Sequence, residues 1–322
     1  MVGGAATVDA TIASVSEGVT PDTVDADALI TLDPSSIGGL EISRAKLDGT
    51  YHQSTGDIRT LDIVGRDLNV QASGTLALND TGQSNLTLHA DSPSLETIGK
   101  LANQPLTGIG KVDATVTGNR RELQATGNLT ADGIKYQDNG ALTVSSDFTA
   151  KVPELTVADA NITANTHATF VTLAGQNINE LDAKTTYARK QVDFDGTAKQ
   201  PQRQLGVGGT LLLHPDHQEV HLTRLALDTQ GQSWQLAPGS AAAINYANDA
   251  VAVKNLALVN KDQQISADGT FGKPGDAMKV TLMNVDLASV DTILLRPPQF
   301  TGRLNATSTI SGVCVISKGK GI

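Results

Sequence analysis

Apolar and polar residues alternate with a period of two along almost the whole chain. Val112, Ala114 and Val116 form one such run, and Val280 and Leu282 belong to another. Short turn sequences rich in Asn, Asp, Gly and Pro separate these runs. This pattern is typical of β-strands that each have one apolar and one polar face. The sequence therefore predicts an all-β protein built from many short strands.

The alternation changes phase at a place that recurs along the chain. Val251 and Val253 occupy odd positions, whereas Leu256 and Leu258 occupy even positions. These four side chains share a face only if a β-bulge at residues 254–255 absorbs one extra residue, and bulges increase the twist of a sheet. We therefore predict an elongated, twisted and curled antiparallel sheet, a β-trough with an apolar concave side.

A longer repeat of about 194 residues accompanies the alternation. Residues 61–76 return as residues 256–271 with six of sixteen identical, and residues 87–118 are echoed by residues 281–312. Each copy contains one stretch with helical spacing that is followed by proline. We divide the chain into a β-repeat array with an incomplete first unit (1–93), a short helix (94–105), a second β-repeat array (106–285), a second short helix (286–298), the strands that start the next unit (299–312) and a non-repeat tail (313–322).

Composition excludes several classes of function. The chain has 24 basic and 34 acidic side chains, a net charge of −10, so no basic field is present to hold nucleic acid. Only 3% of its residues are aromatic, which makes stacking on bases or sugars a poor expectation. Cys314 is the single cysteine, so an internal disulfide is excluded. No segment has the pattern of a membrane span or signal peptide, and the unmatched tail favours a piece of a longer protein.

Sequence motifs for catalysis are missing, so we predict that the protein is not an enzyme and needs no cofactor. It contains no Gly-x-Ser-x-Gly elbow, no phosphate-binding loop of the Walker type and no His-Glu-x-x-His. Asp193 and Asp195 point to the same side of a predicted strand, but we interpret them as part of its polar face. Trp234 takes the place of Ile265 in a 31-residue repeat, so we expect it to pack in the core.

The histidines at 214, 217 and 221 form the only cluster that could gather a metal. On a strand His217 and His221 would lie about 13 Å apart, too far for one zinc ion. His214, Pro215 and Asp216 have the sequence of an exposed turn. We therefore interpret the cluster as a solvated hairpin and predict no metal site.

The repeats resemble those of a known family. Residues 106–118, 123–131 and 256–271 are similar to the repeats of the TamB proteins within the AsmA-like group, which include bridge-like lipid transfer proteins. Members of the family are long envelope proteins of diderm bacteria with an inner-membrane anchor, a periplasmic β-trough and a C-terminal domain that meets an Omp85-type outer-membrane barrel. This chain has neither the anchor nor that domain, so the resemblance implies a middle fragment.

The resemblance implies a periplasmic hydrophobic groove for phospholipid transfer between the inner and outer membranes and for outer-membrane protein biogenesis. Its partners would be phospholipid acyl chains and, through parts outside this chain, an Omp85-type barrel. An alternative is a secreted structural or adhesive β-solenoid, such as an autotransporter passenger, whose apolar side is filled by its own side chains. The residues predicted to line the groove are Leu211, Leu213, Leu225, Leu227, Val251, Val253, Leu256, Leu258, Val280 and Leu282.

Overall fold

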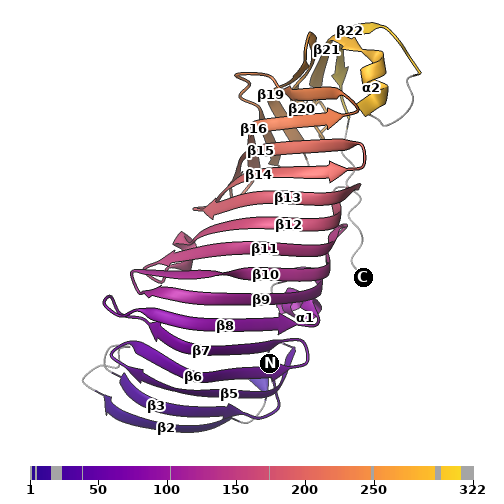
Figure 1. Ribbon diagram of the computed structural model, residues 1–322. Helices are drawn as coiled ribbons and strands as arrows, with labels where there is room; N and C mark the ends of the chain where they lie inside the picture. The colour runs from indigo at the N-terminus through magenta and orange to yellow at the C-terminus, as the bar shows by residue number, and fades with distance from the viewer. Residues whose placement is uncertain are drawn as a thin grey trace. The chain divides into compact units, whose positions relative to one another are not determined.

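The computed structural model describes residues 2–3, 6–15, 24–37, 39–101, 103–173, 175–247, 250–293 and 299–312, and the predicted tail 313–322 lies outside them. The chain divides into two compact units, Met1–Leu181 and Asp182–Ile322, called unit one and unit two below. Antiparallel strands dominate both units, and two short α-helices accompany them (Figure 1). The predicted all-β fold with short helices is confirmed.

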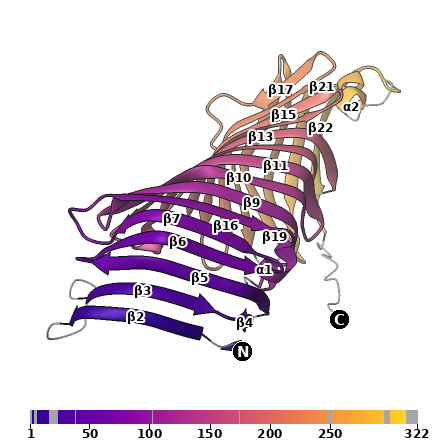
Figure 2. The same cartoon turned by 60° about the horizontal axis from the view of Figure 1, so that its bottom comes forward.

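Unit one is an antiparallel meander. Strand β2 pairs with β3, β3 with β5, and each strand from β5 to β11 then pairs with the next, ending at β12. The short strands β1 and β4 form a side branch on β5. Figure 2 shows strands β5 to β11 strongly bowed, as expected for a curled sheet. The strands are β1 (Val2–Gly3), β2 (Ala6–Val15), β3 (Val24–Leu32), β4 (Ser35–Ile37), β5 (Leu40–His52), β6 (Thr55–Gly65), β7 (Asn69–Ala77), β8 (Ser84–Ser92), β9 (Leu106–Asn119), β10 (Glu122–Tyr136), β11 (Asn139–Pro153) and β12 (Asn161–Leu173). Strand β13 (Gln176–Ala188) spans the boundary between the units.

Unit two continues the same kind of meander with one interruption. Strand β16 pairs with two short strands, β17 and β18, and both of these pair with β19. On either side, β14, β15 and β16 pair in order, as do β19, β20, β21 and β22. The strands are β14 (Gln191–Gln200), β15 (Arg203–Leu213), β16 (Gln218–Thr229), β17 (Gln232–Leu236), β18 (Ala243–Ala247), β19 (Ala250–Asn260), β20 (Gln263–Phe271), β21 (Met278–Asp286) and β22 (Arg303–Ile310).

The 194-residue repeat has a structural counterpart. The order β6, β7, β8, α1 (Leu95–Leu101) and β9 in unit one matches β19, β20, β21, α2 (Leu287–Ile293) and β22 in unit two. Even unusual backbone angles recur: Gly74 and Gly269 have φ of 121° and 124°, and Gly108 and Gly302 have φ of 125° and 113°. Such angles suit glycine because it has no Cβ. The repeat seen in the sequence is therefore a repeat of backbone conformation.

Helix α1 packs on one end of the apolar face of unit one. Gly110 shares that face with Leu88 and Leu129 through the pairing of β8, β9 and β10, and a Cβ added to it would lie 3.2 Å from Leu95. The hydroxyl of Thr97 donates to the carboxylate of Asp67 at 2.6 Å, which fixes the helix to the loop before β7.

Helix α2 occupies the corresponding place in unit two. Its residues Ser289 and Asp291 are each only 1% exposed. The carboxylate of Asp291 accepts a hydrogen bond from the backbone N–H of Gln299 at 2.7 Å, and the Thr229 hydroxyl of β16 donates to Thr292 O at 3.5 Å. Each helix therefore packs at one end of the sheet within its own unit.

Candidate functional site: an uncovered apolar sheet face

The apolar face of unit two is built row by row from the pairing of its strands. Residues directly opposite one another in an antiparallel pair share a face. Leu211 lies opposite Val220, Val220 lies opposite Ile244, and Ile244 lies opposite Val253. One continuous aliphatic row thus crosses β15, β16, β18 and β19.

A second row runs beside the first. Leu258 lies opposite both Leu236 and Ile265, and Ile265 lies opposite Leu282. This row crosses β17, β19, β20 and β21. Together the registers place on one face all ten residues predicted for the groove: Leu211, Leu213, Leu225, Leu227, Val251, Val253, Leu256, Leu258, Val280 and Leu282.

A β-bulge in β19 keeps the two rows on the same face. Val253 lies opposite Gly269 and Leu256 opposite Ala267, so residues 254–255 face the single residue Asp268. Asn255 has φ of 53°, and its backbone N–H donates to the Asp268 carboxylate at 3.0 Å. The bulge predicted at this position is confirmed, and a polar side chain of the opposite strand satisfies its free amide.

Similar register shifts occur in other strands of the sheet. In β21 the register shifts between Leu282 and Val285, Asn284 has φ of 55°, and its N–H donates to the Asn305 side chain of the opposite strand at 2.8 Å. In β6 a shift between Ile58 and Leu61 occupies the place equivalent to that in β19. At each shift the extra residue keeps the apolar side chains before and after it on the same face, although their alternation in the sequence changes phase.

Charged side chains are segregated to the other face. Arg224 donates to Asp195 at 2.7 Å, and Arg303 pairs with Asp262. In the described strands of unit two, Arg203 at the start of β15 is the only Asp, Glu, Lys or Arg whose register places it on the apolar face. The middle of the face therefore offers no partner to a charged ligand.

Burial shows that this face is not the inside of a closed sandwich. Nine of the ten predicted groove residues are half-buried, and only Val253, at 7% exposure, is buried. A second sheet packed on the face would bury these side chains completely. Part of the aliphatic surface on this face is therefore accessible.

The sequence prediction omitted several residues of the same face. Phe194 lies opposite Gly209, Phe271 lies opposite Val251, and Trp234 lies opposite Leu227. Their alternation was visible in the sequence, but only the register shows that they join the same rows. Trp234 is 1% exposed, which confirms the prediction that it packs in the core.

Unit one has an apolar face of the same kind. Leu88 lies opposite both Ala72 and Ala114, and Leu129 lies opposite Val112. Leu129 and Ile162 are 36% and 38% exposed, although register places both on the apolar face. The uncovered face is therefore a property of both units, each considered by itself.

The two acidic residues considered for catalysis have separate partners. The Thr210 hydroxyl donates to Asp193 at 2.6 Å, and this hydrogen bond, with help from Gln191, lowers the pKa of the Asp193 carboxyl. Asp195 is paired with Arg224. Both carboxylates lie on the charged face, where each bonds a side chain of another strand. This agrees with their interpretation as polar strand residues.

These observations define the class of protein: an all-β repeat protein with a largely aliphatic sheet face that β-bulges keep continuous and on which, in the described strands of unit two, Arg203 is the only charged side chain. Residues 57–312 match the family model described as TamB, N-terminal domain, and the chain therefore belongs to the TamB family. TamB proteins are cell-envelope proteins of the translocation and assembly module, which works with an outer-membrane partner of the Omp85 type. No curated protein and no solved structure matches the chain. Within the described residues, neither helix has the length and apolar character of a membrane span.

Proposed function

We propose that the apolar face binds the acyl chains of phospholipids and that the protein uses it to move phospholipid through the periplasm between the inner and outer membranes. The observation that supports this proposal is a half-open aliphatic face on which, in the described strands of unit two, Arg203 at the start of β15 is the only charged side chain. In this role the ten predicted groove residues contact lipid, and no residue carries out bond chemistry. Outer-membrane protein biogenesis then depends on the lipid that the protein supplies.

The energetics favour a continuous face over an isolated pocket. Keeping an acyl chain of about sixteen carbons out of water is worth on the order of 12 kcal/mol, at roughly 0.8 kcal/mol for each methylene. A chain that slides from one aliphatic row to the next keeps most of this free energy at every step. An open face also lets the polar head group stay in water, which avoids the cost of burying its charge.

The partner in this proposal is an Omp85-type outer-membrane barrel, contacted through parts of the protein outside this chain. The charged face of the sheet remains in contact with water. Lipid and barrel would then use different parts of the protein.

Site-specific photo-crosslinking in cells tests the proposal with a control one residue away. A photoreactive amino acid is placed at Leu282 on the apolar face or at Thr281, whose register with Ser266 and Thr307 places it on the other face. Mass spectrometry then searches for phospholipid adducts. We expect adducts at Leu282 and none at Thr281.

A second pair of positions guards against a local artefact. Leu258 lies on the apolar face and Ala257 on the other face of the same strand. Equal labelling at both members of each pair, or no lipid adduct at Leu258 and Leu282, refutes lipid binding by this face. A chain that also fails to bind added lipid would favour the alternative, a secreted structural or adhesive β-solenoid.

A further inference from the structure

A tight hairpin joins β15 to β16 and brings two histidines together. The backbone N–H of His214 donates to His217 O at 3.0 Å, which closes a turn with Pro215 and Asp216 at its centre. Proline at the second position of such a turn presets its backbone angle. Because His214 and His217 are opposite one another at the base of the turn, their side chains project to the same face.

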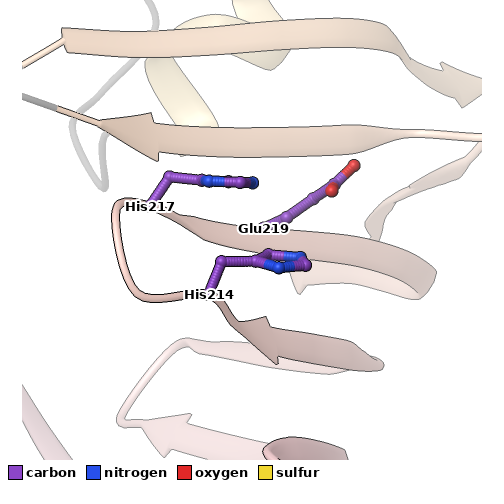
Figure 3. Close-up of side chains that lie close together, drawn as sticks. All are labelled: His214, His217 and Glu219. Carbon is purple, nitrogen blue, oxygen red and sulfur yellow. The ribbon is translucent and has the colours of Figure 1, made fainter.

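Glu219 completes a cluster with these histidines. It lies two residues after His217 on β16 and therefore points to the same side. The imidazole rings of His214 and His217 stack with centroids 4.3 Å apart and 14° between their planes. One ligand atom from each of the three residues lies within 4.8 Å of the others, and Figure 3 shows both rings and the carboxylate extending to one side of the hairpin.

The cluster lies on the charged face of unit two. Glu219 is opposite Leu212, and register places both on the face opposite to Leu211 and Val220. The cluster is therefore separate from the apolar face proposed for lipid. The sequence argument compared His217 with His221 as members of one extended strand and so missed the approach across the turn.

Neighbouring side chains orient two of the three ligands. The Nδ1–H of His217 donates to Asp216 Oδ1 at 2.8 Å, which leaves the lone pair of His217 on Nε2. On the other side, His221 Nε2 lies 3.0 Å from Glu219 Oε1. The pairing of His217 with Asp216 is typical of metal sites, in which a carboxylate commonly accepts a hydrogen bond from the ring nitrogen that does not bind the metal.

We propose that His214, His217 and Glu219 form a binding site for a divalent transition-metal ion, with Zn²⁺ as the best fit. Two imidazoles and one carboxylate are a ligand set that zinc accepts, with bonds of about 2.0–2.2 Å and a fourth position for water. Tetrahedral geometry with such bonds needs ligand atoms about 3.3 Å apart. The three side chains have room to rotate toward a shared ion, because His214 is exposed and the other two are only half-buried.

Calorimetric titration of the full chain, purified without a histidine tag, with zinc chloride tests the site. We expect one ion per chain. His214→Ala and His217→Ala should each weaken binding at least tenfold, and so should Glu219→Gln, which keeps the shape of the side chain. Asp216→Asn should weaken it about 10-fold to 100-fold through the orientation of His217.

His89 supplies the matched control. Its Nδ1 lies 2.6 Å from Asp113 Oδ1, so it is also a histidine beside a carboxylate, but it lies in unit one outside the cluster. His89→Ala should leave zinc affinity unchanged. Binding that is absent in the wild-type chain, or that falls equally in the control, overturns the proposal.

Two further measurements separate the site from weak surface binding and from misfolding. Co²⁺ in place of Zn²⁺ should give the visible absorption of a four-coordinate ion in the wild type and lose it in His217→Ala. Thermal unfolding followed by circular dichroism should show zinc raising the Tm of the wild type and not of that variant. A variant that keeps the wild-type Tm without metal yet retains full zinc affinity refutes the assignment.

Discussion

Replacing Trp234 measures how much one buried ring contributes to the stability of the sheet in unit two. Trp234 is 1% exposed, lies opposite Leu227 in the pairing of β16 with β17, and is the largest of the fully buried side chains. Removing a buried aromatic side chain costs about 3–5 kcal/mol. We expect Trp234→Ala to lie in that range because so little of the ring is open to water.

For Trp234→Phe we expect, in contrast, only a small change in stability. Among the described residues, the indole N–H of Trp234 has no hydrogen-bond partner. A buried donor without a partner costs about 1–3 kcal/mol, and Trp234→Phe removes it. This gain offsets much of the lost ring contact, so Trp234→Phe should stay within about 1 kcal/mol of the wild type.

Urea unfolding followed by far-UV circular dichroism is the suitable assay, because Trp234 is the single tryptophan and its replacement abolishes indole fluorescence. Met283→Ala is the control, since Met283 is 52% exposed and its truncation should cost under about 1 kcal/mol. Trp234→Ala with the stability of the control would refute the packing argument. Trp234→Phe as costly as Trp234→Ala would show instead that the N–H is satisfied.

Three further predictions concern backbone and charge. Asn255→Val should lower stability by about 1–2 kcal/mol and Asn255→Gly by far less, because φ is 53° there, and urea midpoints compare them. Gly269→Ala should cost at least about 2 kcal/mol by thermal unfolding, since its Cβ would lie 2.3 Å from Ala277 O at a φ of 124°. Arg120 lowers the pKa of the Asp80 carboxyl, so the stability from this pair is present above about pH 4 and lost as pH falls through the lowered pKa. Asp80→Asn should therefore flatten the acid limb of a Tm-against-pH curve, and an unchanged limb would contradict the pairing.

The sequence predicted the strands and their faces because both depend on local alternation. The phase change between Val253 and Leu256 was sufficient to place a bulge, since a strand of period two has no other way to keep both on one side. The split of one sheet position into β17 and β18 was not predicted. It depends on how residues 237–242 leave the ladder, and no periodic signal encodes that path.

The sequence could predict which strand positions belong to the apolar face, but it could not predict how exposed that face is. Alternation identifies Leu258 and Leu282 as apolar-face residues, but whether a face is covered depends on what folds over it. The sequence identified the histidines at 214, 217 and 221, but it did not predict the close approach of His214, His217 and Glu219, for a different reason. His214 and His217 meet through a turn hydrogen bond between their backbones, a tertiary detail that strand spacing does not contain.

The bulges also determine which changes of chain length this sheet tolerates. Losing or gaining one residue within a strand such as β19 would move its side chains to the opposite face of the sheet. Lys254 would then lie toward the apolar face, and its aliphatic neighbours would be exposed to water. Extra residues in the hairpin loops have no such effect, and neither does duplication of a whole hairpin. Length variation among relatives should therefore gather in loops and in multiples of complete hairpins, while the residue count between one bulge and the next stays fixed.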